Sequence, residues 1–146
     1  MATLYIMVGI PGAGKTTYAK KKLKHAIRIG SDDLRKEFFG KELTLKGYRA
    51  IHATMLKRAA AQLREGRDVV IDCMNASIRS RRVYFHILPP ECSIVAVYLH
   101  TPVWRALRNN QNRSRHVPVI GILFTRLRLR PPRKSEGFHR VIRYRQ

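Results

Sequence analysis

The chain is poor in negative charge. It has 9 Asp and Glu residues against 30 Lys and Arg residues among 146, which gives a formal net charge of +21 at pH 7. Solubility does not require so large an excess, and a basic surface attracts polyanions, so we expect a polyanionic partner. A second interpretation stays open, in which the surface arginines only keep the fold soluble.

The chain also has few cysteines and no long uninterrupted apolar run. Cys73 and Cys92 are too few for a disulfide framework, so we expect reduced thiols that pack as small hydrophobes, in a cytoplasmic setting. The first apolar stretch is soon interrupted by Gly9 and Pro11, which argues against a signal peptide and a membrane-spanning helix. The six histidines show no metal-ligand spacing.

The length of the chain fits one domain, residues 1–146. Strand and helix signals alternate along it, which predicts an α/β fold with a parallel sheet of five strands and helices on both faces. The expected strands are 4–8, 26–29, 69–71, 93–99 and 140–144. The expected helices are 15–24, 34–39, 45–65, 78–88, 103–112 and 119–129. Such a sheet is nucleoside-kinase-like, and its ligand belongs at the carboxyl ends of the strands.

A phosphate-binding motif follows the first expected strand. Residues 9–16 fill every fixed position of G-x-x-x-x-G-K-[ST], between a strand and a helix, which predicts a P-loop that binds ATP. Lys15 would reach the β- and γ-phosphates, and the Thr16 hydroxyl would bind Mg²⁺. The loop residues expected to contact the nucleotide are Gly9, Pro11, Gly12, Ala13, Gly14, Lys15, Thr16 and Thr17.

Three carboxylates follow expected strands at the ligand-binding edge of the sheet. Asp72 ends an apolar strand, where a carboxylate often holds Mg²⁺ together with the P-loop hydroxyl, here Thr16. Asp32 and Asp33 follow the second strand, and one of them could orient an acceptor hydroxyl or take its proton. Arg35 lies one turn beyond Asp32 and could bind a phosphate of the acceptor. Each Asp could instead cap a helix or turn, and Asp32 and Arg35 could form a surface ion pair.

Residues 105–118 form a basic segment, which we expect to be a lid over the triphosphate. One arginine of the lid could stabilise charge on the transferred phosphoryl group, and the residues alone do not single out which one. The same arginines could also be a solvated helix end favoured by the dipole. Three aromatic residues near or within the basic C-terminal third could stack on bases, but we expect them to pack in the core. They are Trp104, Phe124 and Tyr144.

With these segments described, the chain resembles the 5′-hydroxyl polynucleotide kinase family over nearly its whole length. Members of this family include the kinase domains of phage polynucleotide kinase and of the animal kinase/phosphatase. Residues 9–16 are similar to the family's G-x-P-G-[SA]-G-K-[ST], and residues 130–138 to its closing P-x-x-x-E-G-F. Residues 31–35 are similar to R-D-D-Y-R, in which the first Asp is the general base and the Arg engages the substrate and the reacting phosphate. The resemblance therefore implies these roles for Asp32 and Arg35.

Two other motifs resemble the family and depart from it at one position each. Residues 70–75 are similar to V-I-D-x-T-N, with Met74 where Thr is usual, so the resemblance does not establish a substrate contact at this position. The lid is similar to the pattern R-N-x-x-R, but the second Arg of the pattern would fall on Asn112. From this resemblance we assign the role of that arginine, contact with the nucleotide and stabilisation of the transferred phosphoryl group, to Arg113, with Arg115 as the alternative.

The resemblance implies an ATP- and Mg²⁺-dependent kinase that phosphorylates the 5′-hydroxyl end of DNA or RNA, with no choice between the two. The chain carries neither a D-x-D-G-T phosphatase motif nor a K-x-D-G ligase motif. It would be a stand-alone kinase or the kinase part of something larger. Two alternatives stay open. One is a small-molecule kinase on the same scaffold, and the other is an ATP-dependent nucleic-acid-binding protein without kinase activity.

Overall fold

The computed structural model describes residues 1–39, 45–113 and 117–145. Arg115 and part of the expected lid therefore lie outside the described residues. Among the described helices, none is long and apolar enough to span a bilayer.

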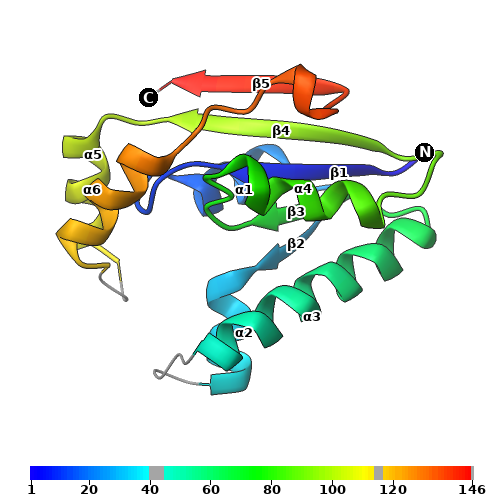
Figure 1. Ribbon diagram of the computed structural model, residues 1–146, viewed down its shortest axis with the longest axis horizontal. Coiled ribbons are helices and arrows are strands. Elements are labelled where there is room, and N and C mark those ends of the chain that lie inside the picture. The colour runs from blue at the N-terminus through cyan, green and yellow to red at the C-terminus, as the bar shows by residue number, and fades with distance from the viewer. Residues whose placement is uncertain (40–44, 114–116, 146) are drawn as a thin grey trace.

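The described strands form one five-stranded parallel sheet, in the order β2-β3-β1-β4-β5 (Figure 1). The strands are β1 (Thr3–Val8), β2 (Ile27–Gly30), β3 (Val69–Asp72), β4 (Ser93–His100) and β5 (Arg140–Arg145). All residues of β3 are buried, as expected for a strand covered on both faces. The predicted fold class is confirmed.

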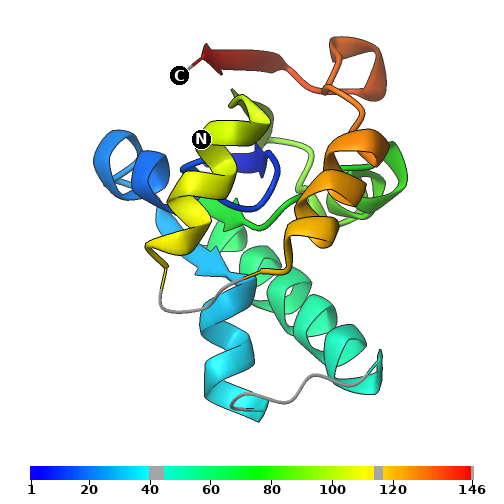
Figure 2. The same cartoon turned by 90° about the vertical axis from the view of Figure 1, so that its left-hand side faces the viewer.

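Helices connect the strands and cover both faces of the sheet. They are α1 (Lys15–Lys22), α2 (Ser31–Phe39), α3 (Leu45–Arg64), α4 (Ile78–Ile87), α5 (Val103–Gln111) and α6 (Val119–Arg128). In Figure 2 the blue α1 lies on one side of the sheet and the green α4 on the other. A 3₁₀ turn, Lys134–Glu136, precedes β5. Every predicted helix is present, with ends that differ by up to three residues.

The second helix shows the largest difference from its predicted bounds. We expected it to begin at Leu34, but α2 begins at Ser31, so that Asp32 and Asp33 lie in its first turn. Negative charge in the first helical turn is favoured by the helix dipole. Both carboxylates therefore remain at the carboxyl end of β2 while belonging to the helix.

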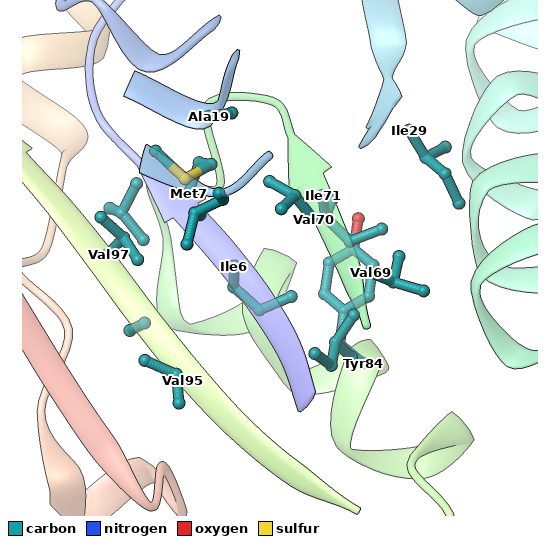
Figure 3. Close-up of a cluster of buried hydrophobic side chains, with 14 of the residues drawn as sticks. Ile6, Met7, Ala19, Ile29, Val69, Val70, Ile71, Tyr84, Val95 and Val97 are labelled. Carbon is teal, nitrogen blue, oxygen red and sulfur yellow. The ribbon is translucent and has the colours of Figure 1, made fainter. Parts of the chain in front are cut away.

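The core lies between the central strands and the helices on either face. Figure 3 shows side chains of β1, β3 and β4, among them Ile6, Ile71 and Val97, packed together with Tyr84 of α4 near the edge of the cluster. Burying each such aliphatic side chain stabilises the fold by about 1.5–3 kcal/mol. This core fixes the strands whose carboxyl ends carry the candidate site.

Both cysteines are free thiols, as predicted. Burial raises the pKa of the Cys73 thiol to about 11, so that it stays protonated and unreactive at neutral pH. The prediction for the three aromatic residues was wrong. Trp104 is 62% exposed, Phe124 57% and Tyr144 40%, so these side chains reach solvent instead of filling the core.

Candidate active site

The P-loop joins β1 to α1 at the carboxyl edge of the sheet, which faces the viewer in Figure 2. Gly12 and Gly14 have φ angles of 84° and 93°, a conformation that L side chains rarely adopt. An ideal Cβ built on Gly12 would lie 2.3 Å from the backbone oxygen of Ala106 in α5. The loop thus needs glycine at position 12 for its own conformation and for its close packing against α5.

Polar side chains from other elements hold the P-loop in place. The Asn109 amide donates to the carbonyl oxygen of Gly12 at 2.9 Å, and the Thr101 hydroxyl donates to that of Ala13 at 3.0 Å. On the other side, the Gly9 N–H donates to the carbonyl oxygen of Met74 at 3.1 Å. The loop is therefore preorganised by α5 and by the segment after β3, as a phosphate cradle requires.

Lys15 begins α1 and turns back into the loop. Its ammonium donates to the carbonyl oxygens of Gly9 at 3.1 Å and Ile10 at 2.9 Å. Burial lowers the pKa of Lys15 to about 8, against the attraction of Asp72, which raises it. The phosphates of a nucleotide would favour the charged form of this lysine.

Thr16 and Asp72 meet, as the sequence predicts. The Thr16 hydroxyl donates to Asp72 Oδ2 at 2.6 Å. Hydroxyl and carboxylate oxygens are the donors that Mg²⁺ prefers, and Mg²⁺ usually takes few protein ligands and completes its shell with water and substrate phosphates. No cluster of three or more His, Cys, Asp or Glu side chains exists among the described residues to form a separate protein cage. The pair therefore fits a Mg²⁺ ion held together with a nucleotide.

Arg28 of β2 is a site residue that the sequence analysis missed. Its guanidinium donates to Asp72 Oδ2 at 2.8 Å and also pairs with Asp33. Arg28 stands between Ile27 and Ile29 in a half-buried strand, a signal that could have singled it out. Asp33 is thus bound to Arg28, and Asp32 is the carboxylate that faces the lid.

Asp32 and the lid arginine come together from distant parts of the chain. The Arg113 guanidinium donates to Asp32 Oδ2 at 3.0 Å, across 81 residues of sequence. Both side chains are partly exposed, 34% for Arg113 and 44% for Asp32, so that both remain accessible to a ligand. The segment that follows α5 and the first turn of α2 therefore meet at the same edge of the sheet as the P-loop.

Arg35 lies one turn beyond Asp32 on α2 and is 9% exposed. Its Nε is buried without a hydrogen-bond partner among the described residues. A buried guanidinium nitrogen left unpaired costs free energy, which an anion bound beside it would recover. This geometry fits the predicted contact of Arg35 with a phosphate.

The remaining predicted residues lie at the margin of this site. Pro11 is buried in the loop, whereas Thr17 is exposed on α1. Met74 is 40% exposed, and its sulfur accepts from the Thr125 hydroxyl of α6 at 3.9 Å. The position that carries Thr in the resembled family thus contacts α6 in this chain.

A buried ion pair that the sequence did not indicate stabilises the loop that follows Asp72. Arg81 of α4 is fully buried and bonds both carboxylate oxygens of Glu136, at 2.9 and 3.0 Å. The same guanidinium donates to the carbonyl oxygen of Asn75 at 2.8 Å. Asn75 has a positive φ of 45°, and its amide donates to Met7 in β1 at 2.7 Å. The Glu of the closing motif therefore fixes the loop after Asp72.

Similar proteins were found by sequence. The chain is 26% identical over 149 residues to a bifunctional polynucleotide phosphatase/kinase of Schizosaccharomyces pombe, covering 94% of this chain and 32% of that protein. It is 25% identical over 146 residues to the transcription factor bHLH140 of Arabidopsis thaliana, covering 94% of this chain and 15% of that protein. The chain thus spans a third or less of the length of these relatives.

Similar structures include both nucleic-acid repair and small-molecule enzymes. A chain in the structure of the Pnkp1/Rnl/Hen1 RNA repair complex superposes with a TM-score of 0.77 at 26% identity, over 88% of this chain and 44% of that one. A gluconokinase from Sinorhizobium meliloti superposes with a TM-score of 0.66 at 18% identity, over 98% of this chain and 82% of that one, which shows a shared fold alone. The resemblance to polynucleotide kinases is confirmed by these matches.

A family model also matches most of the chain. Residues 4–121 match the AAA_33 family, described as an AAA domain, and the match spans the P-loop, Asp32, Asp72 and the start of α6. The chain therefore belongs to the AAA_33 family and has the architecture of a kinase-type P-loop enzyme.

Proposed function

We propose that this protein transfers the γ-phosphoryl group of ATP to the 5′-hydroxyl end of a DNA or RNA strand. The observation that carries the proposal is the charge of the segment that borders the P-loop. Residues 92–135 contain no Asp or Glu, and they include α5, which packs on Gly12, and α6, which contacts Met74. A site with a purely basic segment along one side suits a polyanionic acceptor better than a neutral sugar.

The roles of the site residues follow from their positions. Asp32 would accept the proton of the 5′-hydroxyl as its oxygen attacks the γ-phosphorus and ADP leaves. Lys15 and Arg113 would stabilise the charge on the transferred group. Arg35, with its unpaired Nε, would bind a phosphate of the acceptor strand.

Thr16 and Asp72 would hold Mg²⁺, which supplies positive charge to the phosphates when it is bound. In the described residues the Thr16–Asp72 hydrogen bond already aligns these two groups. Arg113 would leave Asp32 to reach the nucleotide, which would remove its contact with Asp32 Oδ2, so that this oxygen could accept from the acceptor hydroxyl. Nucleotide binding would therefore make Asp32 available to accept the proton of the acceptor hydroxyl.

The small-molecule alternative is favoured by structural likeness to sugar kinases. The chain superposes on a sugar kinase from a Janibacter species with a TM-score of 0.72, over 99% of this chain and 85% of that one. At 19% identity this likeness speaks for the fold and not for the acceptor. The net charge of +21 favours the polynucleotide.

The acceptor is tested by incubating the protein with γ-labelled ATP and a panel of acceptors. The panel holds 5′-hydroxyl DNA and RNA oligonucleotides, a nucleoside 3′-phosphate and gluconate. We expect label on the oligonucleotides, with a KM for the strand that rises steeply as the salt increases from about 50 to about 200 mM. Transfer to gluconate alone would establish the rival, and strand binding without any transfer would establish the non-catalytic alternative.

The base is tested by Asp32→Asn, with Glu37→Gln as the matched control on the same helix. Glu37 is an exposed carboxylate paired with Arg58. Asp32→Asn should lower kcat by about 100-fold or more while ATP binding is kept, because only the proton acceptor is lost. Glu37→Gln should leave kcat unchanged. An Asp32→Asn enzyme as active as the wild type would refute the assigned base.

A further inference from the structure

The Arg28 side chain passes so close to Gly30 that a side chain at position 30 would crowd it. The guanidinium extends from β2 past Gly30 to Asp72 and Asp33, which lie at the carboxyl edge of the sheet. An ideal Cβ on Gly30 would lie 2.7 Å from Arg28 Nη1 and 2.9 Å from Asp33 Oδ2. With glycine at position 30, the ends of Arg28 and Asp33 can lie close to the backbone, whereas a Cβ there would make both side chains shift.

The bridge places a fixed positive charge on the carboxylate that fits Mg²⁺. Asp72 is 7% exposed, and its Oδ2 accepts from both Thr16 and Arg28. A buried carboxylate without a cation is costly, so Arg28 compensates the charge of Asp72 by its direct contact. A metal ion that approaches Thr16 and Asp72 meets a carboxylate whose charge is already offset.

We propose that Arg28 makes divalent-cation binding at Thr16 and Asp72 depend on nucleotide. Without phosphates, the offset carboxylate and one hydroxyl attract a divalent cation weakly. With phosphates in the P-loop, further oxygen ligands and negative charge favour the cation, and the arginine no longer decides the affinity. Arg28 is thus a positioning residue that acts through Asp72.

The coupling is reciprocal. If nucleotide strengthens metal binding, then metal strengthens nucleotide binding by the same factor. This inference rests on the nucleotide and metal parts of the proposed function and not on its acceptor. Its test therefore needs no oligonucleotide, so a failure of this inference can be distinguished from a failure of the polynucleotide assignment.

The test titrates the nucleotide-free protein with Mn²⁺ and follows free Mn²⁺ by electron paramagnetic resonance. Arg28→Met should bind Mn²⁺ about tenfold more tightly than the wild type, because a charge at hydrogen-bond distance from Asp72 is removed. Arg28→Gln, which keeps a polar group near Asp72, should give the same direction. Asp33→Asn should not tighten binding, because it keeps the Arg28–Asp72 contact.

The matched control is Arg67→Met. Arg67 is 57% exposed and pairs with Glu65 before β3, at the opposite edge of the sheet from Asp72. The Arg67→Met substitution removes the same charge from the whole protein as Arg28→Met does. A general effect of net charge on Mn²⁺ affinity would therefore appear in both variants. Equal Mn²⁺ affinity in Arg28→Met, Arg28→Gln and the wild type would overturn the proposal, as would equal tightening in Arg67→Met.

A second measurement has a wild-type arm that does not depend on whether the variants fold. Calorimetric titration with ADP, with and without Mg²⁺, measures the coupling directly. We expect Mg²⁺ to tighten ADP binding in the wild type, and to do so by a smaller factor in Arg28→Met. Wild-type protein that binds Mn²⁺ as tightly without ADP as with it would also overturn the proposal.

Discussion

Replacing Gly12 by alanine separates two reasons for glycine in the P-loop. The φ of Gly12 is 84°, and its ideal Cβ would lie 2.3 Å from the backbone oxygen of Ala106, where ordinary contact begins at 3.4 Å. The neighbouring atom is backbone of α5, so it cannot turn away as a flexible side chain could. Gly66→Ala is the matched control, because Gly66 has a φ of 79° with nothing within 4 Å of its ideal Cβ.

The expected magnitudes follow from these two environments. Gly66→Ala carries only the conformational cost, about 1–2 kcal/mol. Gly12→Ala adds a displacement of about 1 Å between the loop and α5, which breaks the hydrogen bond from Asn109 to Gly12 and strains the packing. A lost hydrogen bond costs about 1 kcal/mol, and overpacking about 1–3 kcal/mol. Gly12→Ala should therefore exceed its control by about 2 kcal/mol or more.

Thermal unfolding and ATP calorimetry measure the two variants. In a chain of this length about 1 kcal/mol lowers Tm by about 3 °C, so Gly66→Ala should lose about 3–6 °C and bind ATP normally. Gly12→Ala should lose more in Tm or bind ATP at least about 30-fold more weakly, since about 2 kcal/mol corresponds to that factor. A Gly12→Ala variant with the Tm of its control and wild-type ATP affinity would refute the packing argument.

Three further changes test the site and its support. Because burial lowers the pKa of Lys15 to about 8, its ammonium is protonated below that pH and neutral above it, so calorimetric ADP affinity should fall between pH 7 and pH 9 in the wild type but not in Lys15→Arg. Glu136→Gln leaves the buried Arg81 without its carboxylate, so urea unfolding should show a loss of about 3–5 kcal/mol, whereas the exposed Glu91→Gln should show none. Gly121→Ala in α6 meets only Val117 at an ordinary 3.5 Å, so helix propensity should raise the stability by about 1 kcal/mol, and an unchanged or lower Tm would contradict this.

The fold could be predicted from the sequence because its strands are apolar runs that end at turn residues. The run that becomes β3 is bounded by Asp68 and Asp72, and the run that becomes β4 ends before Pro102. Such patterns fix the type of each element. The beginning of α2 could not be predicted as well, because Asp32 and Asp33 suit both a cap and a first helical turn.

Side-chain exposure was harder to predict than secondary structure. The sequence shows that α6 is apolar, yet Ile120 is 78% exposed and Leu127 81% exposed in the described structure. Periodicity identifies the apolar face of a helix but not which element, if any, packs against it. The same limit explains the wrong prediction for Trp104 and Phe124, whose hydrophobicity alone suggested the core.

The sequence does not show which basic side chain pairs with each carboxylate. With 9 acidic against 30 basic side chains, the sequence singles out its few carboxylates, and Asp32 and Asp72 were found in this way. Many arginines could pair with each carboxylate, and the one that does so can lie far from it in the sequence. Arg28 is 44 residues from Asp72, and Arg113 is 81 residues from Asp32. Only the folded structure shows these pairs. Because each arginine offsets the negative charge of the carboxylate that it contacts, the pairing affects what each carboxylate can bind.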